Sequence, residues 1–295
     1  SNSALSQFVL TDPEKAIGLE TRTLLVEKDD FKCLPDAENA FRTHWKFNSN
    51  IEFNSGKEID ELLTPENSRD YLVLTGDVRF EVKVVKGVRQ LEHAVTLALY
   101  PGENSGRRND VEVERHFVVK MSFPYCISSE VELKLAAECM AKQVEQVSLM
   151  GEKSAKMQKP AIDESRTKMM TQKTLLLSQG MVDFTEDEAK KVYSFPLKFV
   201  SDEEIRKVIL SGSAEEVIVD AVWSDRKFRW SLMAFDLTDY MPLVESRFEN
   251  MKSPPKAKSD FDEATEYLSI LKGKKKIDIV ALKALSGEIK KANAK

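Results

Sequence analysis

The sequence of 295 residues contains few cysteines, few histidines and no long apolar run, and each shortage excludes a class of protein. Cys33, Cys126 and Cys139 are odd in number and form no CxxC pair, which argues against a disulfide scaffold and a cysteine-built zinc site. No run approaches the roughly 18 apolar residues of a membrane-spanning helix. Residues 1–10 show neither the basic leader nor the apolar block of a signal peptide. We therefore expect a protein without a membrane span, in the cytoplasm or another reducing intracellular compartment.

Glycine and proline are also scarce, with 11 and 10 residues, so little of the chain is expected to form loops and turns. The nucleotide-binding motifs GxGxxG and GxxxxGK[ST] and the nucleophile motif GxSxG are absent, and we expect no small-molecule cofactor. No internal sequence repeat is evident. The length corresponds to about two average domains, and charged residues make up 32% of the chain, as in a globular protein with a heavily solvated exterior.

The first half of the chain is rich in β-forming residues. Runs at 71–75 and 78–85 are separated by Gly76-Asp77, which has the length and composition of a two-residue hairpin turn. A second pair of runs, 93–100 and 111–121, is joined by a polar loop. The pattern predicts an antiparallel sheet of at least four strands in this region.

Helical patterns begin in the middle of the chain. Ser129 and Glu132 form a capping-box pattern ahead of apolar residues spaced by three and four, which predicts a helix over 130–150. Further elements are expected in the order helix 165–177, helix 186–192, helix 202–210, strand 217–223 and strand 228–235.

Together these elements predict an α+β fold in four parts. They are a sheet-rich N-terminal region (1–127), a central helical section (128–183), a smaller α+β region (184–251) and a C-terminal helical arm (252–295).

The arm carries a charge opposite to that of the body. It contains eleven lysines, no arginine and six acids, hence a net charge of +5, whereas the whole chain carries −5. Such an arm can dock on an acidic surface, of its own or a neighbouring subunit, or bind phosphate. Apolar residues within it favour docking and a homo-oligomer assembled through them: Phe261, Tyr267, Leu268, Leu271, Ile277, Val280 and Leu285.

Basic clusters elsewhere are compatible with RNA or single-stranded DNA, although each is also typical of a solvated surface. The candidate phosphate-binding residues are Arg107, Arg108, Lys153, Lys156, Lys159, Arg166, Lys168, Lys173, Lys274, Lys275 and Lys276.

An enzymatic alternative comes from the expected hairpin. A turn at Gly76-Asp77 would place Asp70 opposite Lys83, with Glu81 on the same face. Carboxylates on neighbouring strands can hold a divalent metal, while a lysine stabilises the charge of a phosphoryl transition state. A half-exposed strand has the same alternation of charged and apolar residues without any catalytic role. A divalent metal is therefore expected as a cofactor only if this nuclease alternative is correct.

Two weaker patterns point to other chemistry. Asp110, Glu112, Glu114 and His116 share one face of an expected strand, but only two of them can reach one metal ion because same-face side chains spread along the strand. Cys126 has no fixed base beside it in the sequence, which favours a structural thiol. The leading hypothesis is thus a non-enzymatic binding and self-assembly protein.

Overall fold

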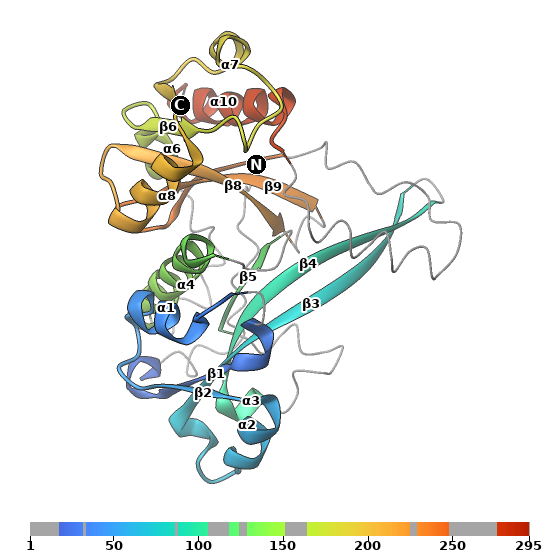
Figure 1. The fold of residues 1–295 in the computed structure, drawn as a ribbon, viewed down its shortest axis with the longest axis vertical. Helices are drawn as coiled ribbons and strands as arrows, with labels where there is room; N and C mark the ends of the chain where they lie inside the picture. The colour runs from blue at the N-terminus through green and yellow to red at the C-terminus, as the bar shows by residue number, and fades with distance from the viewer. Residues whose placement is uncertain are drawn as a thin grey trace.

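The structure is a computed structural model that describes residues 18–31, 34–85, 88–105, 118–123, 129–150, 164–224, 229–247 and 276–294. It confirms the α+β fold. The described residues form two five-stranded mixed sheets, and each sheet is covered by helices. The two sheets lie one above the other in Figure 1. We call residues 18–150 the first unit and residues 164–294 the second unit.

The first unit contains one sheet with strand order β2-β1-β3-β4-β5. Its strands are β1 (Thr23–Glu27), β2 (Ile51–Asn54), β3 (Tyr71–Val85), β4 (Val88–Pro101) and β5 (Val119–Phe123). Its helices are α1 (Ala37–His44), α2 (Gly56–Leu62), α3 (Gly102–Ser105) and α4 (Glu130–Met150), with short 3-10 helices η2 (Leu19–Thr21), η3 (Lys28–Phe31) and η4 (Ser68–Asp70).

The second unit repeats this arrangement, with strand order β7-β6-β8-β9-β10. Its strands are β6 (Thr174–Leu177), β7 (Leu197–Phe199), β8 (Glu216–Ser224), β9 (Arg229–Asp236) and β10 (Pro242–Arg247). Its helices are α6 (Glu164–Met169), α7 (Glu186–Val192), α8 (Asp202–Ser211) and α10 (Ile279–Asn293). In both units one helix follows the first strand, a second helix follows the second strand, and a long helix follows the fifth strand.

The strand registers of the two units also agree. In each unit, one residue of the first strand lies opposite a residue of both the second and the third strand. In the first unit Leu24 pairs with Ile51 and Leu72, and in the second unit Leu175 pairs with Leu197 and Val217. The antiparallel strands continue the equivalence: Leu99 faces Val119, and Ala234 faces Val244. Identical topology and register indicate an internal duplication, although no repeat is evident in the sequence.

The long helices α4 and α10 occupy equivalent places. Each begins at a residue whose side chain accepts a backbone N–H three residues later, Ser129 in α4 and Asp278 in α10. Counting from these caps, every position that α10 buries is also buried in α4. The pairs are Ala281 and Glu132, Leu282 and Leu133, Leu285 and Ala136, Ser286 and Ala137, Ile289 and Met140, and Ala292 and Gln143.

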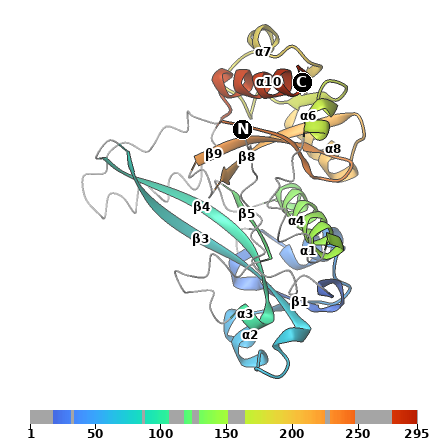
Figure 2. The same ribbon diagram turned by 180° about the vertical axis from the view of Figure 1, so that it is seen from behind.

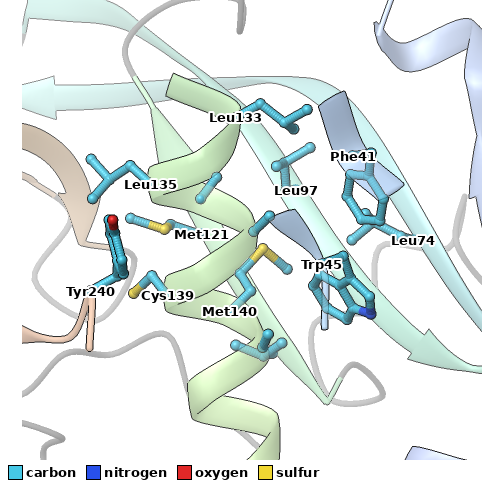
Figure 3. Close-up of a cluster of buried hydrophobic side chains, with 14 of the residues drawn as sticks. Phe41, Trp45, Leu74, Leu97, Met121, Leu133, Leu135, Cys139, Met140 and Tyr240 are labelled. Atoms are coloured by element: carbon cyan, nitrogen blue, oxygen red, sulfur yellow. The ribbon is translucent and has the colours of Figure 1, made fainter. Parts of the chain in front are cut away.

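The two units share helix α4, which buries a second side against the second unit. Figure 3 shows Tyr240 beside Leu135 and Cys139, while Met140 lies on the side of Trp45 and Phe41. Lys134 Nζ donates to Leu210 O at 2.6 Å and lies 5.0 Å from the centre of the Tyr240 ring. One apolar core therefore runs from the first sheet through α4 to the second sheet. Helix α10 covers the opposite face of the second sheet (Figure 2).

Several predicted elements are confirmed. The expected helices at 130–150, 186–192 and 202–210 correspond to α4, α7 and α8, and the strand pair near 217–235 corresponds to β8 and β9. The pairing of 93–100 with 111–121 is confirmed where Leu97 faces Met121.

Other predictions were wrong. The first sheet is mixed rather than antiparallel, because β1 pairs in parallel with both β2 and β3. The helix expected at 165–177 ends at Met169, and Thr174–Leu177 is the strand between β7 and β8. The central helical section (128–183) therefore supplies a strand to the second sheet.

Candidate functional site

The predicted hairpin turn at Gly76-Asp77 does not exist. Strand β3 runs straight through these residues and pairs with β4 along its length, so that Glu81 faces Glu92 and Lys83 faces Gln90. Asp70 lies in η4, before β3 begins. Glu81 lies eleven positions after Asp70 along β3, about 35 Å away at the usual rise per residue. The Asp70, Glu81 and Lys83 constellation of the nuclease alternative is therefore not assembled.

Gly76 serves close packing instead of a turn. Its backbone N–H donates to Asp30 Oδ2 at 2.8 Å, where η3 lies against β3. A Cβ atom at this position would come within 3.1 Å of Asp30 Cβ and 3.2 Å of Leu97 Cδ2. Glycine inside a strand can mark such an approach as well as a turn, and the sequence alone does not distinguish the two.

The other predicted metal ligands and the second cysteine lie outside the described residues. These are Asp110, Glu112, Glu114, His116 and Cys126. Within the ranges that the structure does describe, no three histidine, cysteine, aspartate or glutamate side chains are close enough to hold one metal ion.

Two of the predicted phosphate-binding bases hold the second unit together. Lys173 Nζ lies 2.8 Å from Asp236 Oδ1 and also donates to Ala214 O at 2.6 Å, and both charged side chains are almost fully buried. Burial acts to raise the pKa of Asp236, but hydrogen bonds from Lys173 and Thr238 outweigh it, so this pKa lies below its ordinary value. Lys173 is therefore not available to bind phosphate.

Arg166 is similarly engaged. It forms a bidentate ion pair with Asp239, with N···O distances of 2.8 and 2.9 Å, and fixes α6 against the strand end at Met241 and Pro242. Lys168 and Lys276 are exposed. The remaining predicted bases lie outside the described ranges: Arg107, Arg108, Lys153, Lys156, Lys159, Lys274 and Lys275. The structure thus brings no phosphate-binding groove together from the bases that it places.

The part of the C-terminal arm that the structure describes packs on its own chain. Ile277 is buried and joins a parallel bridge to Val182, with hydrogen bonds of 2.8 and 3.1 Å to Met181 and Asp183. Leu285 is fully buried in the core of the second unit, whereas Val280 is half exposed. Residues 276–294 belong to the arm through which the sequence predicted oligomer assembly, but α10 packs on its own chain as the last helix of the second unit. Phe261, Tyr267, Leu268 and Leu271 lie outside the described residues.

The structure also shows a contact between an imidazole and a carboxylate that no sequence pattern indicates. His44 Nε2 lies 2.9 Å from Glu130 Oε1, at the place where the last turn of α1 meets the first turn of α4. The two residues are 86 positions apart, so no spacing rule could have paired them. The contact joins α1 to α4 within the first unit.

The feature that most distinguishes the two units is the β3–β4 hairpin. In the second unit the last described pair of the equivalent hairpin is Ser224 with Arg229, and only residues 225–228 connect its two strands. In the strand register of the first unit, the equivalent pair is Arg79 with Ala94. Here β3 and β4 continue beyond this pair, as far as Val85 and Val88. Figures 1 and 2 show this extension as a two-stranded ribbon that projects from the body.

We call residues 79–85 and 88–94 the ribbon. The second unit folds with a shorter hairpin, so the fold does not require the extension. Elaborations of a shared framework are common places for binding functions. The ribbon is accordingly the candidate interaction surface.

Comparisons with protein-family models, with curated proteins and with solved structures find no match to this chain. None of the helices within the described ranges is both long and apolar enough to cross a membrane.

Proposed function

We propose that this protein functions by binding and self-assembly rather than by catalysis, and that the ribbon of the first unit is the part that makes the intermolecular contact. The observation that carries the proposal is the difference between the units. They share topology, register and helix packing, yet only the first unit extends its hairpin far beyond the sheet.

The placement of the ionisable residues supports a binding role. Lys173 and Arg166 are engaged in internal ion pairs, and the three residues of the nuclease alternative are spread along one strand and the helix before it. Lys173 and Arg166 thus stabilise the fold, and the three residues of the nuclease alternative do not converge on one substrate site.

Binding of RNA or single-stranded DNA is a competing hypothesis that the structure leaves with less support. It now depends on exposed Lys168 and Lys276 and on bases outside the described residues. The experiment below therefore distinguishes nucleic-acid binding from self-assembly.

An intracellular, reducing location is part of the same proposal. Cys139 is a free thiol buried in the core, and burial raises the pKa of this thiol, as does the Asp239 carboxylate. A reactive or disulfide-forming cysteine needs access and a lowered pKa, which Cys139 lacks.

The experiment is a measurement of the mass of the full chain by light scattering between about 1 and 100 µM protein, together with a filter-binding assay using a labelled single-stranded RNA at low and high salt. Self-assembly predicts a mass that rises above 33.5 kDa with concentration. A mass that stays at one chain throughout contradicts the proposal. Salt-sensitive retention of the RNA by such single chains favours the nucleic-acid hypothesis in its place.

A further inference from the structure

The sheet edges of the body are short or covered. Strand β7 has three residues, and on β2 the carbonyl of Ile51 accepts a hydrogen bond of 2.6 Å from Arg42 Nη1. Helix α6 covers the edge strand β10, where Thr167 Oγ1 donates to Leu243 O at 2.9 Å. Such features prevent unwanted pairing of strand edges between molecules.

The outer edge of β3 differs. Strand β1 pairs with β3 only as far as Leu74, and Asp30 binds the next exposed N–H, at Gly76. From residue 77 to residue 85, β3 pairs with β4 on one side and with no strand among the described residues on the other. Nine residues span about 30 Å, which exceeds the average length of a strand in globular proteins. A long edge of this kind can accept another strand through main-chain hydrogen bonds.

The sequence of this edge is complementary to itself. An antiparallel pair of two β3 strands centred on Val82 would place Glu81 of each chain opposite Lys83 of the other. In the same register Phe80 would lie opposite Val84. Opposite charges and aromatic with β-branched residues are favourable cross-strand pairs, and each would occur twice about a two-fold axis.

The outer edge of β4 is less suitable. The corresponding pairing of two β4 strands, centred on Leu91, would place Arg89 opposite His93 and Gln90 opposite Glu92. It would therefore bring together no pair of opposite charges.

We propose that two copies of this chain dimerise by antiparallel pairing of their β3 edges over residues 79–85, centred on Val82. This inference rests on the proposed self-assembly and identifies its surface and its partner, which is a second copy of the chain. The two ribbons then form one four-stranded sheet of order β4-β3-β3-β4. Because β4 is the less complementary edge, the assembly closes as a dimer with two-fold symmetry.

Charge exchange provides the test. Glu81→Lys places two lysines opposite two lysines in the dimer, and Lys83→Glu places glutamates opposite glutamates. The dimer affinity of each variant alone is expected to be at least about tenfold lower than that of the natural chain. An equimolar mixture restores both attractive pairs, so a heterodimer of twice the 33.5 kDa chain mass is expected.

The substitutions leave the hairpin itself intact. Glu81 faces Glu92 within the hairpin, so Glu81→Lys replaces a like-charge pair by an opposite-charge pair, and Lys83 faces the neutral Gln90. Glu61→Lys on the exposed surface of α2 makes the same change in net charge away from the ribbon and is the matched control. It is expected to dimerise like the natural chain.

The measurement is sedimentation velocity of the full-length chains, alone and mixed. If the natural chain is monomeric at every concentration, the self-assembly proposal is wrong. If the natural chain assembles and both ribbon variants assemble equally well, self-assembly stands and the ribbon pairing is overturned. If each variant is weakened but the mixture is not restored, the register centred on Val82 is overturned.

Discussion

At the scale of single residues, the basic side chain before the first strand has the same role in both units. Arg22 Nη1 lies 2.9 Å from Glu103 Oε2 in the first unit, and Lys173 is paired with Asp236 in the second. Each cation immediately precedes a buried strand and reaches an acid near the end of the fourth strand. Lys173 looks like a surface base in the sequence because the sequence shows its charge but not its burial.

The buried ion pair makes a prediction about stability. Lys173→Met leaves the Asp236 carboxylate buried without its cation, which is expected to lower the free energy of unfolding by about 3 kcal/mol. Lys190→Met removes an exposed pair with Glu186 and is expected to change the free energy of unfolding far less. Urea denaturation of both variants is the measurement. If both variants lower the free energy of unfolding by the same amount, burial does not make the Lys173–Asp236 pair more stabilising than an exposed pair.

A second residue-scale prediction concerns pH. In the capping box of α2, hydrogen bonds from the backbone and side chain of Ser55 lower the pKa of Glu58 from 4.5 to about 2, with a further contribution from Lys28. A folded-state pKa below the unfolded value means that the stabilisation is complete above pH 4.5 and is lost as the pH falls towards 2. The stability difference between the natural chain and Glu58→Gln should therefore shrink across this interval.

Thermal denaturation at a series of pH values measures this difference. Glu61→Gln removes the same charge from the same helix, away from its cap, and corrects for the change in net charge. A difference between the natural chain and Glu58→Gln that stays constant from pH 5 to pH 2 would contradict the assigned role of the Glu58 carboxylate.

At the scale of elements, α10 behaves as a structural part of the second unit. Leu285 is fully buried against the second sheet, and Leu285→Ala is expected to cost about 3 kcal/mol of unfolding free energy. Val280→Ala, on the half-exposed side of the same helix, should cost well under 1 kcal/mol. Truncation after Met251 should therefore unfold the second unit, which circular dichroism and the loss of one unfolding transition would show. A truncated chain with a fully folded second unit would show that the helix is dispensable.

Elements with a strong period and a clear cap were predictable from the sequence. A capping box forms at Thr185, and the Ser201 side chain accepts the backbone N–H of Glu204; α7 and α8 begin immediately after these two residues. Short apolar segments were not predictable. Strand β6 has four residues, and its run of leucines after a helical pattern looks like one more turn of helix, because periodicity does not separate short buried strands from helices. Gly76 was misleading for a related reason, since its role depends on η3, which lies 46 residues earlier.

At the scale of the whole molecule, the duplication was hidden by uneven spacing. Equivalent residues are 151 positions apart in the first strand, at Leu24 and Leu175, but 125 apart in the fifth, at Val119 and Val244. The longer ribbon and the different connections shift the spacing from strand to strand, so no fixed period exists. One local match remains visible, since Ser55-x-x-Glu58-Ile59 and Ser201-x-x-Glu204-Ile205 follow equivalent strands and begin equivalent helices.

The position of each unit in the pair explains how the two long helices differ. Helix α4 lies between the units and buries Leu135 and Cys139 on its second side, whereas α10 covers only the second sheet and carries the more exposed Ala284 and Glu288 at the equivalent positions. The equivalence of α4 and α10 supplies a matched pair of substitutions.

Leu135→Glu places a carboxylate in the core between the units and is expected to lower the free energy of unfolding by about 3 kcal/mol or more. Ala284→Glu makes the equivalent change on the outer side of α10 and is expected to cost less than about 0.5 kcal/mol. Denaturant titration followed by tryptophan fluorescence reports on both units, through Trp45 in the shared core and through Trp223 and Trp230 in the second unit. Similar losses for the two substitutions would mean that α4 is no more enclosed than α10, and the joining of the two units through α4 would have to be abandoned.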